Sequence, residues 1–250
     1  MLQGSIDSEN RRSQLGEILR SKGAVILGEV SSKLGVSEMT IRRDLKEMEH
    51  NGMARRVRGG AVAVGPELFQ RRINTAAGAK KEIAKKLSSL LPDSGAVGFD
   101  ASSTIYQLAH KLEPRDISIL CTGIETASLL SRSRKVSVSI SGGTIEETTG
   151  ALVGPLAIAS IEQYVFTRSF VSPTCISPEF GVMEATVAGA QIKMALREAS
   201  KSLVVAIDST KLGESAMARA LQLEEIDILV TELNPHDHAL DDFRERVEIL

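Results

Sequence analysis

The sequence predicts a mixed α/β protein with a small helical domain at the N-terminus and a larger domain built on a mostly parallel sheet. Two observations predict this class. Short helical periodicities and a cluster of basic residues fill the first 62 residues, whereas apolar strand-like runs alternate with helical segments from residue 80 onward. A chain of 250 residues can hold one small and one medium domain. We therefore expect a first domain over residues 8–62, a linker over 63–79 and a second domain over 80–250.

Composition and charge are those of an ordinary globular protein. Hydrophobic residues make up 42% and charged residues 25%, and no apolar run is long enough to span a bilayer, so no membrane partner is expected. Cys121 and Cys175 lie far apart without metal-ligand spacing, which indicates buried reduced thiols of a cytoplasmic protein. Residues 1–64 carry 11 Lys/Arg against 8 Asp/Glu, whereas residues 65–250 carry 19 against 24. A basic head on an acidic body is typical of a nucleic-acid-binding domain attached to one that does not bind nucleic acid.

The first domain opens with two predicted helices, over residues 8–22 and 27–34. Apolar residues recur at helical spacing in both, which predicts one buried stripe on each helix. Gly35 follows the second helix, and a residue without Cβ can take the left-handed conformation that a tight turn requires there.

A third helix is predicted after this turn, with Ser37 as its cap. Ile41, Leu45 and Met48 lie at positions i, i+4 and i+7 and are expected to face the core. The helical rotation of about 100° per residue then turns the opposite face to solvent. That outward face carries Met39, Arg42, Arg43 and Lys46, with Thr40 at its flank.

The outward face has the chemistry of a helix that reads DNA. Arginine forks match the guanine edge, and lysine neutralises phosphates. Arg55, Arg56 and Arg58 precede two glycines, which predicts a short two-stranded wing gripping the flanking backbone. The turn, cap, paired arginines and basic wing together favour a double-stranded DNA interface over an ordinary solvated face. The predicted DNA-binding residues are Ser37, Met39, Thr40, Arg42, Arg43, Lys46, Arg55, Arg56 and Arg58.

Strands and helices alternate along the second domain. Strands are predicted at residues 96–99, 117–121, 136–140, 169–171, 203–207 and 228–230, and helices at 80–91, 104–112, 124–131, 156–163 and 190–199. This alternation indicates a Rossmann-like domain with a mostly parallel sheet. Ligands of such sheets bind beyond the carboxyl ends of the strands.

Polar turns follow several of these strands. Taken singly, each turn is more simply a helix cap or a tight turn, and a lone lysine is more simply solvated. Their common position at one end of the sheet favours a pocket, and hydroxyls and free N–H groups at a helix N-terminus favour an anion such as phosphate. The predicted effector-binding residues are Asp100, Ser102, Ser103, Thr104, Thr122, Gly142, Gly143, Lys193, Asp208 and Lys211.

These motifs resemble those of the DeoR family of bacterial transcriptional regulators. The family's "VS-x-x-T-IRRDL" recognition helix is similar to residues 36–45, and its "R-x-x-GGA" wing is similar to residues 56–61. The second domain resembles the family's effector domain, which shares its fold with ribose-5-phosphate isomerase. The "DSSK" motif is present at residues 208–211, whereas the acidic residue of the "EA-x-VK" motif is replaced by Gly189.

The resemblance implies a winged helix-turn-helix that binds a DNA operator and a pocket that binds a phosphorylated sugar or related metabolite. It implies a repressor of a metabolic operon that acts as a homodimer or homotetramer, with no cofactor, metal or catalytic residue. The run from His236 to His238 is interpreted as a helix start rather than a metal site.

Two alternatives stay open. One is a sugar-phosphate isomerase-like enzyme with an accessory DNA-binding head, in which Asp100, Glu184 or Asp208 would serve as the base. The other is a DNA-binding scaffold with a ligand-free pocket.

Overall fold

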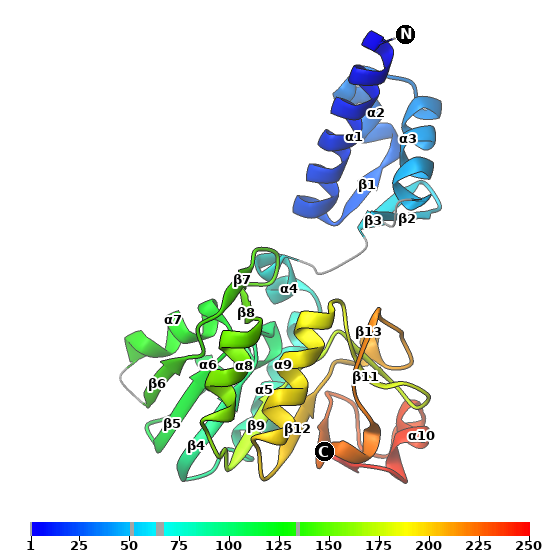
Figure 1. The fold of residues 1–250 in the computed structure, drawn as a ribbon. Coiled ribbons are helices and arrows are strands. Elements are labelled where there is room, and N and C mark those ends of the chain that lie inside the picture. The colour runs from blue at the N-terminus through cyan, green and yellow to red at the C-terminus, as the bar shows by residue number, and fades with distance from the viewer. Residues whose placement is uncertain (1, 51–52, 64–67, 134–135) are drawn as a thin grey trace. The chain divides into compact units, whose positions relative to one another are not determined.

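The fold is described by a computed structural model that covers residues 2–50, 53–63, 68–133 and 136–250 (Figure 1). Two compact units follow one another along the chain, Met1–Arg71 and Arg72–Leu250. The first unit is a small helical domain with a short sheet, and the second is a larger α/β domain with a parallel sheet. The predicted fold class is therefore confirmed.

Three helices and a three-stranded antiparallel sheet form the first unit. Strand β3 lies between β1 and β2, so the sheet has one strand more than the predicted two-stranded wing. The extra strand has only three residues, too few to show a period-two pattern beside a helix. The elements are α1 (Leu2–Lys22), β1 (Ala24–Ile26), α2 (Leu27–Leu34), α3 (Glu38–His50), β2 (Ala54–Val57) and β3 (Gly60–Ala63).

The core of the first unit forms where the helical periodicity predicts it. Ile41, Leu45 and Met48 are buried against Leu15 of α1. Gly35 ends α2 with a φ of 64°, the left-handed conformation expected of this turn. The outer face of α3 is thereby fixed by the burial of its inner face.

A parallel sheet of seven strands forms the centre of the second unit. Its order is β15-β14-β12-β9-β4-β5-β6, and every neighbouring pair is parallel. All six predicted strands belong to it. The strands are β4 (Ser94–Phe99), β5 (Asp116–Cys121), β6 (Ser137–Ile140), β9 (Arg168–Val171), β12 (Leu203–Ala206), β14 (Ile228–Val230) and β15 (Glu248–Ile249).

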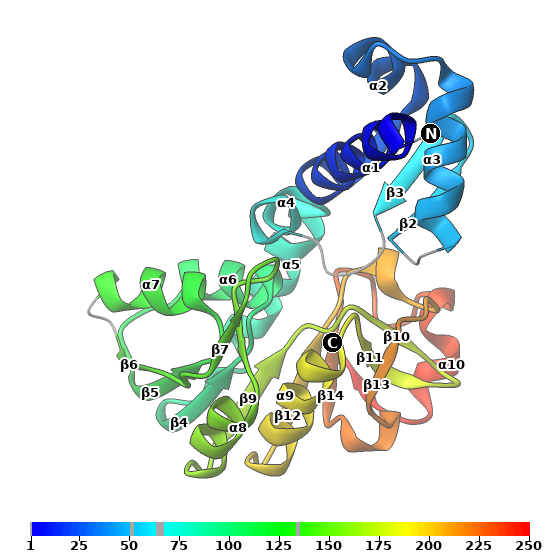
Figure 2. The ribbon, with the colours of Figure 1, turned by 45° about the horizontal axis from the view of Figure 1, so that its top comes forward.

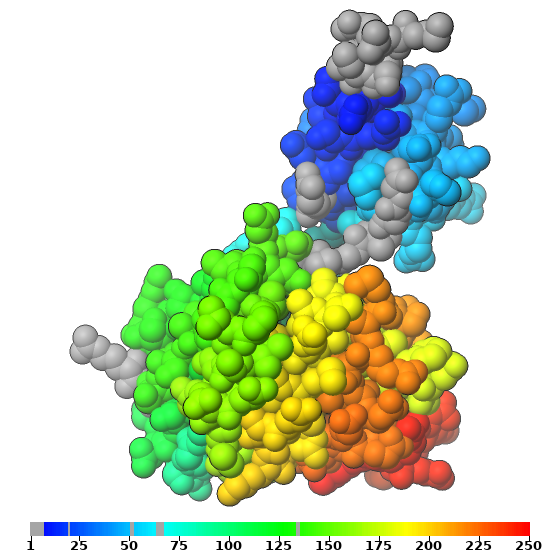
Figure 3. All heavy atoms as spheres, in the orientation of Figure 1, coloured from blue at the N-terminus to red at the C-terminus, as the bar shows by residue number. Residues whose placement is uncertain are grey.

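Helices cover both faces of this sheet (Figure 2). One hydrophobic cluster joins the sheet to α5 (Ala77–Ser88), α6 (Ser103–His110) and α7 (Ile124–Ser133). A second cluster joins the other face to α8 (Pro155–Glu162) and α9 (Val187–Glu198), which cover that face in the space-filling view (Figure 3). No helix in the described part of the chain is long and apolar enough to cross a membrane.

Several short elements of the second unit are absent from the sequence prediction. Unlike helix α10 (Asp241–Arg244), which follows the helix start predicted at His236–His238, the β7–β8 hairpin (Thr144–Glu146 and Ala151–Val153) and a small sheet of β10 (Cys175–Ser177), β11 (Gly181–Glu184) and β13 (Ala218–Leu221) were not predicted. None exceeds four residues, which is too short for a readable period.

Helix α4 (Phe69–Asn74) occupies part of the segment predicted as a linker, and the boundary between the two units falls within it. The buried Lys80 amine donates hydrogen bonds to the carbonyls of Arg72 and Thr75, at 2.6 and 2.8 Å. The C-terminal part of α4 is therefore fastened to α5.

The direction of the chain across the sheet changes at β4. From β4 the chain adds β5 and β6 on one side, and it then returns to place β9 on the other side of β4. The carboxyl ends of β4 and β9 thus form the topological switch point at which α/β domains bind ligands.

Candidate nucleic-acid interface and ligand site

Helix α3 starts at the cap predicted from the sequence. The Ser37 hydroxyl accepts a hydrogen bond from the Thr40 backbone N–H at 3.2 Å and shares another with the Thr40 hydroxyl at 2.9 Å. Glu38 lies in the first turn, where a negative charge suits the helix dipole. The N-terminus of α3 is therefore locally ordered by its own side chains.

The outer face of α3 is exposed and basic. Met39 is 69% exposed, and Arg42, Arg43 and Lys46 are exposed beside it. An Arg42 nitrogen lies 3.7 Å from a carboxylate oxygen of Glu38, and both side chains are more than half exposed. Such exposed pairs contribute about 0–1 kcal/mol, so Arg42 can exchange Glu38 for another anion at little cost.

The arginines of the wing are not equivalent. Arg55, Arg56 and Arg58 are all exposed, but only Arg56 shows an ion pair, with Nε 2.6 Å from a carboxylate oxygen of Glu49, among the described residues. Glu49 also accepts the backbone N–H of Arg56 at 2.8 Å, and this bond, with the Arg56 side chain, holds the pKa of Glu49 below its usual value. Arg56 therefore joins the wing to α3, a role that sequence reasoning missed because no periodic pattern links the two residues.

A buried ion pair seats α3 on α1. Asp44, on the inner side of α3, is 3% exposed, and one of its oxygens lies 2.5 Å from Nε of Arg11. A second Arg11 nitrogen donates to the other oxygen at 3.3 Å. The aspartate of the recognition-helix motif is thus a positioning residue and faces away from the exposed basic side.

In the second unit, three charged side chains meet at the switch point. The Lys193 amine on α9 lies 3.0 Å from Asp100 Oδ2, after β4, and 2.9 Å from Glu184 Oε1, at the end of β11. We call Asp100, Lys193 and Glu184 the triad. Burial alone would lower the pKa of Lys193, but its attraction to the two carboxylates outweighs burial and raises the pKa above its ordinary value. Lys193 is therefore a cation.

Asp100 also ties together the turns that follow β4 and β9. It accepts the backbone N–H of Ser102 at 3.0 Å and that of Ser172 at 2.7 Å. The Ser172 hydroxyl donates to the Thr104 hydroxyl at 3.0 Å, and Ser102 caps α6 by accepting the Ile105 N–H at 3.2 Å. The predicted residues after β4 are thus brought together, and Ser102 also acts as a helix cap.

Two further predicted residues lie nearby in buried positions. Ser103 is the first residue of α6 and is 3% exposed. Thr122, after β5, is 1% exposed, and its hydroxyl has no hydrogen-bond partner in the part of the chain that the structure describes. A buried hydroxyl without a partner is unusual in native proteins and points to a missing ligand or water.

Asp208 and Lys211 occupy the turn after β12. Lys211 Nζ donates to the carbonyl of Pro173 at 3.1 Å and lies 3.9 Å from Asp208 Oδ2. That Asp208 oxygen is buried and accepts no hydrogen bond from any described residue. Burial, which opposes the attraction of Asp208, lowers the pKa of Lys211. Since both residues follow β12, they lie at the carboxyl end of the sheet, as the sequence predicts.

Gly142 and Gly143 are not joined to the triad by any contact among the described residues. Their φ angles of 69° and 110° belong to the left-handed region that side chains rarely adopt. The turn between β6 and β7 accounts for both glycines.

Glu184 occupies the place of the carboxylate that Gly189 lacks. A Cβ atom on Gly189 would lie 3.6 Å from Glu184 Oε2, so the carboxylate from β11 covers the α9 position where the family motif has an acidic residue. From the sequence, Glu184 was expected only as a candidate base of the enzyme alternative. The signal that was missed lies in the sequence: the acidic residue of the family motif is replaced by Gly189, and another acidic residue, Glu184, stands five positions before it.

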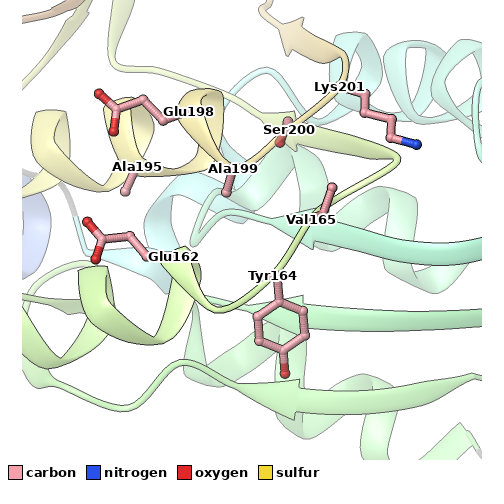
Figure 4. Close-up of a pocket in the computed structure, with 8 residues that line it drawn as sticks. All are labelled: Glu162, Tyr164, Val165, Ala195, Glu198, Ala199, Ser200 and Lys201. Carbon is pink, nitrogen blue, oxygen red and sulfur yellow. The ribbon is translucent and has the colours of Figure 1, made fainter.

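A separate shallow pocket of about 380 Å³ lies at the opposite, amino-terminal edge of the sheet, just before β9 and β12 (Figure 4). Its charged side chains, Glu162, Glu198 and Lys201, are exposed. It shares no residue with the predicted effector-binding set, and the buried triad is the better candidate for a ligand site. The pocket is lined by Glu162, Tyr164, Val165, Ala195, Glu198, Ala199, Ser200 and Lys201.

The chain resembles known proteins along nearly its whole length. The DeoR-like helix-turn-helix domain matches residues 11–67, and the DeoR C terminal sensor domain matches residues 75–233. The HTH-type transcriptional regulator GlpR of Haloferax volcanii is 32% identical over 95% of this chain and 93% of its own length. The HTH-type transcriptional repressor GlcR of Bacillus subtilis is 27% identical over 93% of this chain and 92% of its own length.

Similarity to solved structures is more distant. Ribose 5 phosphate isomerase A from Neisseria gonorrhoeae aligns over 53% of this chain and 52% of that chain, with 18% identity and a TM-score of 0.37. A similarity of this extent carries no functional argument.

An exposed basic helix beside a basic wing, in one chain with an α/β unit that gathers buried charges at its switch point, defines a DNA-binding regulator with a sensor domain. The match of the sensor domain to more than half of the chain, together with the similarity to GlpR, makes the family clear. The chain belongs to the DeoR family of transcriptional regulators. It is a sequence-specific DNA-binding regulator, as predicted from the sequence.

Proposed function

We propose that the protein represses a metabolic operon in the cytoplasm and that a phosphorylated sugar or related metabolite modulates its binding to the operator. Residues 8–62 bind DNA, and residues 80–250 bind the effector and form a homodimer or homotetramer. The observation that carries this proposal is the cluster of buried charged and hydroxyl groups at the carboxyl ends of β4, β9 and β12. Relatives whose names describe them as repressors, such as GlcR, support the direction of regulation.

The DNA contacts divide into two groups. Met39, Thr40, Arg42 and Arg43 lie on α3, where they can reach base edges, with Ser37 at its N-terminus. Lys46, Arg55, Arg56 and Arg58 hold phosphates, and the ion pair to Glu49 makes Arg56 the weakest of them. Substituting Arg42 by Ala should cost roughly 1–3 kcal/mol at one base position and relax specificity there.

The effector contacts follow the charges of the pocket. Ser102, Ser103 and Thr104 open α6, whose N-terminus suits a phosphate, and Lys211 supplies a cation at the same end of the sheet. Thr122 and Asp208 contribute buried oxygen atoms that lack hydrogen bonds from described residues. Gly142 and Gly143 stay in the proposed site only as backbone.

A ligand at this position can influence the chain that leads to the head. An Arg72 nitrogen donates to the carbonyl of Ala101, between Asp100 and Ser102, at 3.3 Å and to that of Thr149 at 2.9 Å. Arg72 lies in α4, the first helix after the wing. Displacement of the turn after β4 would therefore act on α4, which gives ligand binding a physical route to the operator affinity.

The test begins with genome-wide mapping of bound sites, because neighbouring genes identify the pathway and the candidate metabolites. Operator binding by the full chain is then measured with a panel of pentose and hexose phosphates. We expect at least one compound to change the operator affinity. Operator binding that no phosphorylated metabolite changes would favour the scaffold alternative, and turnover of any compound would favour the isomerase-like enzyme.

A further inference from the structure

The triad has hydrogen-bonding capacity that the described residues do not use. The Lys193 amine has three N–H donors, and its nitrogen lies 3.0 Å from Asp100 Oδ2 and 2.9 Å from Glu184 Oε1. In Glu184, Oε1 faces Lys193 and Oε2 accepts the Thr174 hydroxyl at 2.9 Å. Each carboxylate oxygen can accept two hydrogen bonds, so Oε2 keeps one position open, and the buried Oε1 accepts no hydrogen bond from any described residue.

Asp100 differs from Glu184 in this respect. Its Oδ2 already faces two donors, the Lys193 amine and the Ser172 N–H, and its Oδ1 accepts the Ser102 N–H. Asp100 is also fully buried, whereas 12% of the Glu184 side chain is exposed. Glu184 is therefore the carboxylate of the triad that a ligand can reach.

The charge of the triad decides which part of a ligand it accepts. Two carboxylates and one ammonium group leave a net charge of −1. A phosphate group only accepts hydrogen bonds and is repelled by this charge. A hydroxyl group is neutral, and it can donate to Glu184 while it accepts from Lys193. The triad fits a hydroxyl group and disfavours phosphate.

Buried polar atoms beside the triad also indicate a ligand rich in hydroxyl groups. The Thr122 hydroxyl and Asp208 Oδ2 are both buried, and neither has a hydrogen-bond partner among residues that the structure describes. They follow β5 and β12, one on each side of the pair β4–β9 that carries Asp100 and Ser172. A ligand with several hydroxyls would satisfy both atoms.

We propose that Glu184 is the specificity-determining residue of the pocket and that it binds the sugar hydroxyls of the effector and not its phosphate. The inference rests on the proposed function, in which the effector is a phosphorylated sugar. The phosphate then lies toward Lys211 and the N–H groups at the N-terminus of α6, and the sugar hydroxyls face Glu184. Lys193 positions Glu184 and donates to the same hydroxyl, so it is not a phosphate ligand.

The test compares two probes on the full chain, with operator release as the readout. One probe is the phosphosugar that releases the parent most effectively, and the other is inorganic phosphate as its competitor. Glu184→Gln keeps the shape of the side chain and removes its charge. We expect this substitution to weaken phosphosugar binding, measured by operator release, by about tenfold or more, because a charged hydrogen bond is lost. Competition by inorganic phosphate should stay unchanged.

Two further variants make the result specific. Glu179→Gln is the matched control, since Glu179 is exposed in the turn that precedes β11, and it should change neither probe. Glu184→Asp keeps the carboxylate and should retain the preference for the phosphosugar. It also keeps the test decisive if the amide variant does not fold.

Three outcomes would overturn the inference while the proposed function stands. In the first, Glu184→Gln weakens the binding of both probes equally. In the second, it weakens the binding of neither. In the third, inorganic phosphate fails to compete with the phosphosugar in the parent. If no phosphosugar changed operator binding by the parent, the proposed function itself would be contradicted, so the two failures are distinguishable.

Discussion

The ion-pair partners of charged residues in the first unit distinguish the side chains that can bind DNA from those that stabilise the unit itself. Of the arginines predicted to contact DNA, Arg42 and Arg56 both face a carboxylate, but Arg56 is held by a shorter and better connected pair. Burial distinguishes Asp44, whose pair with Arg11 lies inside the head. The Arg56–Glu49 and Arg11–Asp44 pairs are invisible to spacing rules because they connect different elements, whereas Arg42 and Glu38 form an i, i+4 pair within α3.

Glu49→Gln should strengthen DNA binding. The substitution releases Arg56 from its carboxylate partner, so Arg56 can neutralise a phosphate, and the dependence of log affinity on log salt should steepen by about 0.9. Operator titrations at several salt concentrations measure this slope. Glu47→Gln removes the same charge from the exposed side of α3 without releasing an arginine and should leave the slope unchanged. Weaker binding by Glu49→Gln would show that the pair is needed to hold the wing.

Asp44→Ala should destabilise the head by about 3 kcal/mol, because it leaves the partly buried Arg11 without its carboxylate. Hydrogen exchange of the α1 and α3 amides in the full chain measures the effect. Glu47→Ala on the same helix should change these amides by less than about 0.5 kcal/mol. Equal exchange in the two variants would mean that the buried pair does not stabilise the docking of α3.

The two cysteines should not react with thiol reagents in the native protein. Burial raises the pKa of the Cys121 thiol to about 12, and burial together with Glu184 raises that of Cys175 to about 11, so almost no thiolate exists near pH 8. Colour development with a disulfide reagent at pH 8 tests this, with a denatured sample as the positive control. Rapid reaction of the native protein would contradict the burial of both thiols.

At the scale of elements, sequence patterns succeed where an element is long enough to repeat its period. Helix α2 begins and ends at the predicted residues, and all six predicted strands are found, because burial imposes a pattern on each. The pattern fails for β1, β7, β8, β10 and β11, each of three or four residues. Glu184 lies on one of these short strands, which explains why its place beside Lys193 could not be predicted.

The cap of α3 gives a prediction at this scale. Ser37→Ala removes the side-chain acceptor of the Thr40 N–H and should destabilise the head by about 1 kcal/mol. Ser37→Asp keeps an acceptor and should retain most of the stability. Ser32→Ala, at an exposed position within α2, serves as the control. Chemical denaturation followed through the α3 amides distinguishes these variants, and a neutral Ser37→Ala would show that this side-chain cap does not stabilise α3.

For the whole molecule, the alternation of strands and helices was sufficient to predict a parallel sheet, and parallel sheets place their ligands at the carboxyl ends. Asp100, Thr122, Asp208 and Lys211 were found at that end for this reason. The order of the strands could not be predicted, since the switch between β4 and β9 depends on a long return connection. The role of Ser172, which follows β9 and binds Asp100, was missed for the same reason.

If the protein is a symmetric oligomer, its footprint on DNA should show two half-sites. Their centres should be one helical turn apart, about 10–10.5 base pairs, or a multiple of it. Footprinting of the full chain on a mapped site measures this spacing. A single half-site protected at all protein concentrations would contradict the proposed oligomer.

The carboxylate that completes the triad comes from the small β10–β11–β13 sheet, whereas its lysine comes from a helix packed on the main sheet. The ligand preference and the framework are therefore encoded in separate stretches of the chain. Changes in the β10–β11 hairpin can alter which metabolite is recognised while the parallel sheet and the DNA-reading helix keep their sequences. Related regulators could diverge in this way, acquiring new signals through a few substitutions in one hairpin.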